Sequence, residues 1–131
     1  MLILPVTLCA AAAAAIINLW LAIRCGQMRS QTKLVHGDDH GGPLTRRMRA
    51  QLNFVENTPW VLALILAIEL TGKADLWLPY VAGVYMLGRV AHGFGMDSEE
   101  VSKPRMLGVG ITMLTQLGLA IVAVLIVMGV M

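Results

Sequence analysis

Charged side chains are scarce in this sequence: they make up 14% of its 131 residues, whereas roughly a quarter is usual in soluble globular proteins. Apolar residues make up 57%, and the mean hydropathy is +0.72. This composition argues against an ordinary soluble domain. The net charge is only +2, which is too small to indicate binding to nucleic acid. At this length a single domain over residues 1–131 is expected.

Cysteine is almost absent as well, with only Cys9 and Cys25 in the chain. Both fall on the first apolar run, sixteen residues apart, which on a helix is about four turns. That separation is too great for a disulfide bond between them. The sequence therefore excludes a disulfide-stapled scaffold.

Long apolar runs are what the chain does contain. A helix needs about 20 mostly apolar residues to cross a bilayer, and the run from Leu2 to Ile23 provides them without a charge. This run lacks the positively charged start of a cleaved signal peptide, so a retained helix is expected. The sequence predicts an all-α integral membrane protein, a four-transmembrane-helix bundle with up-down-up-down topology. The expected helices are residues 2–28, 46–72, 75–96 and 104–130.

The basic residues are distributed unequally along this topology. Nine of the ten fall toward the first and third connections, and only Lys73 falls in the second. Basic connections generally face the cytoplasm, so both termini are expected on the opposite side. The shortness of the chain and the lack of eukaryotic sorting signals favour a bacterial inner membrane, with periplasmic termini.

A polar stripe opens the second expected helix. Arg49, Asn53 and Glu56 are spaced i, i+4 and i+7, so they share one helix face, while Gln51 and Asn57 are expected to point elsewhere. Glu56 lies about 10 Å along the helix from Arg49, inside the membrane boundary. A carboxylate at that depth needs a partner or a water-filled cavity. An internal Arg–Glu clamp and a ligand site both remain open.

The third and fourth helices carry polar residues toward the same end. Arg89 and His92 are spaced i and i+3, and Tyr85 lies one turn below Arg89. Arg105 opens the fourth helix. The expected set of six site residues converges on one level of the bundle, which packing alone does not explain because each polar group is costly there.

The chemistry of this set indicates its ligand. Arginine guanidinium groups bind carboxylates in a bidentate manner, and Glu56 and Asn53 suit an ammonium group and an amide. A small zwitterionic peptide with more than one carboxylate fits these groups. An arginine directed at a thiol would stabilise the thiolate, which is the nucleophilic form.

Two motifs and one position resemble a known family. The run RAQLNFVEN in residues 49–57, the segment GRVAHGFGM in residues 88–96 and the lone Arg105 at the start of the fourth helix resemble the MAPEG superfamily, membrane-associated proteins of eicosanoid and glutathione metabolism. Its microsomal glutathione transferases are the nearest type, and the resemblance suggests a bacterial member. It covers the whole chain in length, helix count and motif order.

The resemblance implies a homotrimer that binds glutathione between neighbouring subunits near the cytoplasmic face. A hydrophobic electrophile or lipid would arrive laterally from the bilayer and be detoxified by conjugation. A peroxidase activity toward lipid hydroperoxides is compatible with the same site. In the implied roles Arg105 stabilises the thiolate, and the glutathione-binding residues are Arg49, Asn53, Glu56, Arg89 and His92.

The chain departs from the strongly active members of this family. They tend to carry a tyrosine directly after the second-helix glutamate, where this chain has Asn57, and tyrosines late in the third helix, where it has His92 and Met96. A non-catalytic relative that binds lipid or a partner protein, as the lipoxygenase-activating member does, is therefore a second hypothesis. A small multidrug transporter is a third, although the first helix lacks the carboxylate that such transporters carry.

The remaining polar residues are given structural interpretations. His36, Asp38, Asp39 and His40 form a glycine-rich solvated loop, and no metal is expected there.

Two side-chain pairs are also expected. Glu69 and Lys73 are spaced for an i, i+4 ion pair, and Gln116 is expected to bond Asn18 across two helices.

Overall fold

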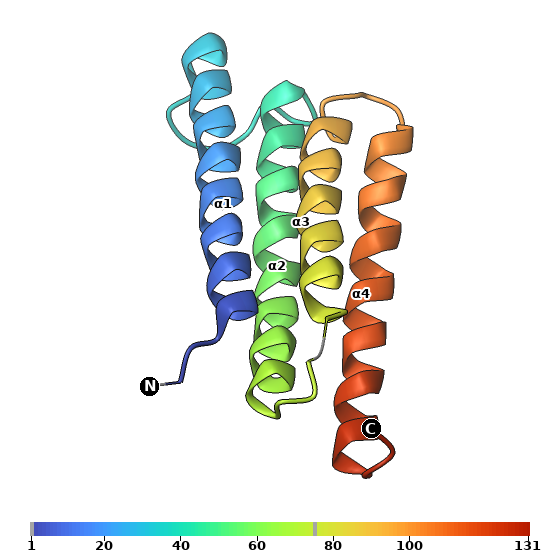
Figure 1. The fold of residues 1–131 in the computed structure, drawn as a ribbon. Helices are drawn as coiled ribbons and strands as arrows, with labels where there is room; N and C mark the ends of the chain where they lie inside the picture. The colour runs from blue at the N-terminus through green and yellow to red at the C-terminus, as the bar shows by residue number, and fades with distance from the viewer. Residues whose placement is uncertain (1, 75) are drawn as a thin grey trace.

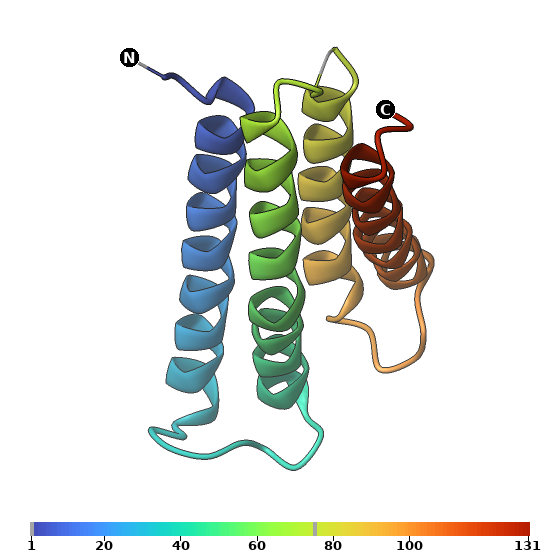
Figure 2. The same cartoon turned by 90° about the horizontal axis from the view of Figure 1, so that it is seen from below.

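The computed structural model describes residues 2–74 and 76–131, which form four antiparallel α-helices (Figure 1). No strand occurs within these two ranges. The helices pack as a bundle in which α1 lies against α2 and α3, while α4 lies against α3 and α2. Figure 2 shows α4 inclined to the other three. The helices are α1 Pro5–Thr32, α2 Pro43–Leu70, α3 Leu78–Gly95 and α4 Lys103–Val127.

The helix bounds differ from the expected ones by a few residues, and proline explains most of the starts. Every helix has a proline at its first or second position, where the missing N–H is not needed. Thus α1 begins at Pro5 and not at residue 2, and α2 begins at Pro43 and not at 46. The expected start of the third helix, residue 75, lies outside the described residues, and α3 begins at Leu78. At its other end α1 continues beyond the expected residue 28 to Thr32. Lys33 then ends the helix in a left-handed conformation with φ of 56°.

The composition of α1, α2 and α4 makes them long and apolar enough to cross a membrane. By the same criterion α3 does not qualify, because Arg89 and His92 lower its mean hydropathy. Both side chains are buried against the neighbouring helices, so the polar content of α3 faces protein and not lipid. The all-helical membrane bundle of four helices is confirmed, and three of the four are apolar enough by composition alone to cross a membrane.

The outer surface of the bundle is apolar around much of its circumference. Ile16, Trp60, Leu87 and Leu114 are 68%, 69%, 71% and 73% exposed. An apolar surface of this extent on a soluble protein would lead to aggregation, whereas in a bilayer it is solvated by lipid. The protein is therefore an integral membrane protein.

Glycines bring α3 and α4 into close contact at the level of Arg89. A methyl group added to Gly108 would lie 2.5 Å from Cβ of His92 and 2.6 Å from the carbonyl oxygen of Gly88. One added to Gly88 would lie 2.9 Å from Cγ2 of Ile111. Only residues without a side chain fit at these two positions, and they allow Arg89 to reach α4.

Replacing Gly108 with alanine is expected to destabilise the bundle by about 1–3 kcal/mol, the usual cost of overpacking. The matched control is Gly110→Ala, because an added methyl group there meets no atom within 4 Å. That variant should be neutral or more stable by up to about 1 kcal/mol, since alanine favours helix. Unfolding of both variants in detergent measures the difference, and equal stabilities would contradict this account of the contact between α3 and α4.

Two carboxylates accept hydrogen bonds from the backbone N–H groups at the starts of α1 and α2. Glu69, at the end of α2, accepts from the backbone N–H groups of Val6 and Thr7 at 2.9 and 2.7 Å. The predicted Glu69–Lys73 ion pair is therefore wrong. The Glu69 carboxylate instead accepts hydrogen bonds from backbone N–H groups at the start of α1 that have no partner within their own helix.

Asp39 has the corresponding role at the start of α2. Its carboxylate accepts from the backbone N–H groups of Leu44 and Thr45, both at 2.8 Å, and from the Thr45 hydroxyl at 2.7 Å. Desolvation acts to raise the pKa of this carboxyl, but the Thr45 and Leu44 hydrogen bonds outweigh it and lower the pKa to about 2.

Candidate functional site

The side chain of Arg89 on α3 forms the centre of the candidate site, and it is only 1% exposed. Its Nη1 donates to the Thr112 hydroxyl on α4 at 2.8 Å, and its Nη2 donates to Oδ1 of Asn53 on α2 at 2.7 Å. The guanidinium carbon lies 5.9 Å from the centre of the Phe54 ring. One buried side chain therefore joins three helices.

No carboxylate neutralises Arg89 within residues 2–74 and 76–131. Its partners are a neutral amide and a neutral hydroxyl, and its Nε has no hydrogen-bond partner in the same ranges. A buried ion without a counter-ion costs several kcal/mol. Arg89 is therefore a buried cation with one donor unused among the described residues.

His92 lies one turn along α3 from Arg89 and is 3% exposed. Its Nδ1 is 3.5 Å from Nη2 of Arg89. An arginine N–H donates only to an unprotonated ring nitrogen, so this contact favours a neutral imidazole with its proton on Nε2. The structure thus brings together three of the predicted site residues. We call Asn53, Arg89, His92 and Thr112 the Arg89 network.

Arg49 and Glu56 share α2 with Asn53 but lie outside the Arg89 network. Both side chains are exposed, and neither forms an ion pair within the part of the chain that the structure describes. The internal Arg–Glu clamp is therefore not formed. These two charged groups face outward at the side of the bundle.

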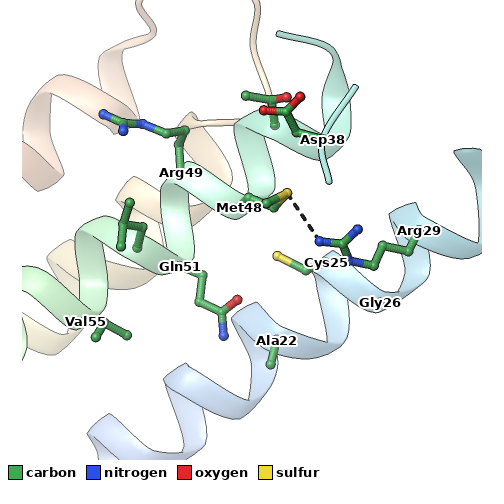
Figure 3. Close-up of a pocket in the computed structure, with 11 residues that line it drawn as sticks. Ala22, Cys25, Gly26, Arg29, Asp38, Met48, Arg49, Gln51 and Val55 are labelled. Carbon is green, nitrogen blue, oxygen red and sulfur yellow. Dashed lines mark hydrogen bonds between the residues drawn. The ribbon is translucent and has the colours of Figure 1, made fainter. Parts of the chain in front are cut away.

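A cavity of about 610 Å³ lies beside Arg49, between α1 and α2. In Figure 3, Cys25 and Arg29 approach it from α1 and Gln51 approaches it from α2, whereas the Arg49 guanidinium extends away from them. Nη2 of Arg29 lies 3.5 Å from the sulfur of Met48. The cavity therefore contains the buried thiol of Cys25 and has both basic and acidic groups in its lining.

Arg105 lines a separate cavity of about 360 Å³, which the two connections at the basic end enclose with α2 and α4. Its backbone N–H donates to the Ser102 hydroxyl at 3.4 Å. Its guanidinium forms no ion pair with another described residue. Within the chain the six predicted residues are therefore divided: three belong to the Arg89 network, and three lie around its periphery.

The sequence interpretation missed Thr112 and assigned Gln116 to the wrong partner. Nε2 of Gln116 donates to Oδ1 of Asn57 on α2 at 2.9 Å, whereas the expected partner Asn18 is exposed on α1. A signal for Thr112 was present: the buried positions of α4 are Gly108, Thr112, Thr115 and Leu119. In the sequence, Gly108, Thr112 and Thr115 are small or polar residues at helical spacing in an otherwise apolar helix, and this pattern indicates the face that packs against protein.

A second arginine, Arg24 on α1, is also buried. The sequence interpretation did not predict its structural role. Its guanidinium lies over the rings of both Trp20 and Phe94, 4.9 and 5.1 Å from their centres. It donates to the carbonyl oxygen of Gly93 at 2.9 Å and forms an ion pair with Asp97. Arg24 therefore has the carboxylate partner that Arg89 lacks.

In the loop that contains His36 and His40, Asp39 has a structural role, because its carboxylate caps α2. His40 approaches Asp38, with 3.6 Å between Nδ1 and Oδ1. No group of three or more potential metal ligands occurs among the described residues.

Comparison with protein-family models gave one match: the model of the MAPEG family matches residues 7–125. This range contains the whole Arg89 network and the peripheral residues Arg49, Glu56 and Arg105. Comparisons with curated proteins and with solved structures gave no match.

Proposed function

From the premise that the chain belongs to the MAPEG family, we propose that it is a membrane-bound glutathione transferase. The family comprises membrane proteins of glutathione and eicosanoid metabolism, so this proposal selects one activity within it. In the proposed reaction glutathione binds at the basic end, between the subunits of a homotrimer. Its thiolate then attacks a hydrophobic electrophile that enters from the bilayer.

The observation that carries this proposal is the uncompensated charge of Arg89. A guanidinium that is 1% exposed and bonded only to neutral groups favours an anionic ligand nearby. Glutathione supplies two carboxylates and, when ionised, a thiolate. Asn53 orients Arg89, and the neutral His92 adds a second polar group on the same face of α3.

The exposed charges of Arg49 and Glu56 support a site between subunits. Both stand on the side of α2, on a protomer whose outer surface is otherwise largely apolar. Charged groups at membrane depth normally face a protein interior or a water-filled cavity. A neighbouring subunit with bound glutathione between the two would provide both, which is why we propose the trimer.

The proposed chemistry needs few groups from the protein. Arg105 at the start of α4 stabilises the sulfur anion, and the thiol proton leaves to solvent at the basic end. The sulfur forms a bond to the electrophilic carbon while the bond to the leaving group breaks, and that group departs with the electron pair. By the charge distribution of the connections, we also place this end in the cytoplasm.

Titration of glutathione into the purified protein, followed by ultraviolet absorbance of the thiolate, tests the proposal. S-methylglutathione is the matched control, because it retains both carboxylates but cannot form a thiolate. A thiolate signal with glutathione alone supports the transferase. Binding of both compounds without a thiolate signal would instead indicate a non-catalytic relative that binds lipid or a partner. If neither compound binds, the glutathione proposal fails.

A further inference from the structure

The cavity at the basic end that Arg46 and Arg105 line contains one arginine, Arg46, that the transferase proposal does not use. It lies between the start of α2, the start of α4 and the connection after α3. Its volume is about 360 Å³, which accommodates a small polar group but not a whole lipid. We propose that it binds a phosphate group, presented by an anionic lipid headgroup or by a free phosphate compound.

Arg46 is the residue on which this inference rests. Its side chain is 20% exposed, and its Nε is buried without a hydrogen-bond partner in the described part of the chain. Among the described residues its Nη1 has two long contacts, 3.4 Å to the carbonyl oxygen of Gly41 and 3.9 Å to a carboxylate oxygen of Glu99. This guanidinium is confined at the cavity wall with most of its donors unused.

The charge balance of the cavity favours an anion. Arg46 and Arg105 contribute two positive charges and Glu99 one negative charge, so the lining has a net charge of +1. The Glu99 side chain is 86% exposed, so water screens its charge more than those of the arginines. The Asp39 carboxylate already caps the start of α2 and the Ser102 hydroxyl caps the start of α4, so the attraction for an anion comes from the two guanidinium groups.

The geometry of the donors suits phosphate. Two guanidinium groups approach from α2 and α4, and Ser98 lines the cavity from the third side. Phosphate oxygens accept several charge-assisted hydrogen bonds at once, and arginine is well suited to donate them. Basic pockets between membrane helices are recurrent sites for anionic headgroups.

The membrane setting explains how a lipid would present its phosphate. Val101, Met106 and Leu107 border the start of α4 and are 64%, 58% and 59% exposed. Acyl chains in contact with these side chains would leave the headgroup at the level of Arg46. The site shares Arg105 with the proposed transferase but does not depend on glutathione chemistry.

Binding of phosphatidylglycerol to the purified full chain tests the inference, with phosphatidylcholine of the same acyl chains for comparison and inorganic phosphate as a third probe. One tight phosphatidylglycerol per chain is expected, and Arg46→Gln should weaken it about 10- to 100-fold by removing charge-assisted hydrogen bonds. Lys33→Gln is the charge-matched control, because Lys33 is exposed at the same end outside the cavity. It should weaken binding by less than about fivefold.

Glu99→Gln gives a result of opposite sign and an independent test should Arg46→Gln fail to fold. Removing the competing carboxylate should tighten phosphatidylglycerol binding about two- to fivefold. Tight binding of inorganic phosphate, with no preference between the lipids, would assign the site to a soluble phosphate compound. Equal binding of all three probes, or unchanged affinity in both variants, would overturn the inference.

Discussion

Arg105→Ala is expected to abolish the thiolate signal of bound glutathione and to lower kcat/KM by about 10²- to 10³-fold, the usual cost of removing one group that stabilises a reacting anion. Arg105 lies on the wall of its cavity without an ion-pair partner among the described residues. Its charge is therefore free to act on a ligand. Absorbance titrations and steady-state kinetics with a hydrophobic electrophile measure the two effects.

Lys103→Ala provides the matched control for Arg105→Ala. Lys103 opens the same helix, is exposed and does not line the cavity. Its removal lowers the local positive charge equally but should leave the thiolate signal in place. If both variants lose the signal to the same extent, general electrostatics and not Arg105 itself would explain it.

Arg89→Met is expected to separate binding from folding. The change removes a buried charge that has no counter-ion among the described residues. It leaves Oδ1 of the half-buried Asn53 without its donor, while Thr112 retains its hydrogen bond to the Gly108 carbonyl at 2.8 Å, so stability should fall by no more than about 1 kcal/mol. Under the proposed function, glutathione affinity should nevertheless fall by about 10²-fold, because the buried charge proposed to attract the ligand is lost. Calorimetric titration and detergent unfolding report on the two properties.

Arg24→Met is the natural comparison, because Arg24 is also a buried arginine but has a carboxylate partner. Its removal leaves the carbonyl oxygen of Gly93 without its donor and weakens the attachment of Asp97, which retains only Arg47 at 3.4 Å. A loss of stability of about 1–3 kcal/mol is expected, with glutathione affinity largely retained. The opposite pattern, with Arg89→Met unfolding the protein, would identify Arg89 as a structural residue.

Much of the fold was accessible from the sequence, because a bilayer imposes a simple rule on helix length and hydropathy. The same rule makes any buried polar residue conspicuous, which is how Asn53, Arg89 and His92 could be selected before their contacts were known. Helical spacing showed that Arg89 and His92 share a face. The spacing of one helix does not determine which neighbour that face meets.

The contacts that the sequence did not predict all depend on which neighbouring helix a given face meets. Gln116 pairs with Asn57 and not Asn18 because α4 packs on α2 and α3, an arrangement set by the rotation of each helix. Glycines 88 and 108 determine how closely α3 and α4 approach, so they also determine that Arg89 reaches Thr112. Glu69 was paired with its nearest charge in sequence, whereas the free backbone donors of α1 lie more than sixty residues away.

Trp20 packs against Phe94 with tilted rings, so its fluorescence can report on the contact between α1 and α3. Its ring lies 4.9 Å from that of Phe94, and the Arg24 guanidinium covers it at 4.9 Å. Trp60 and Trp77 are the other two tryptophans. With both replaced by phenylalanine, Trp20 becomes the single emitting tryptophan, and its ring lies close against Gly93 of α3. Its emission wavelength and quenching then follow the separation of α1 from α3 in real time, without an attached dye.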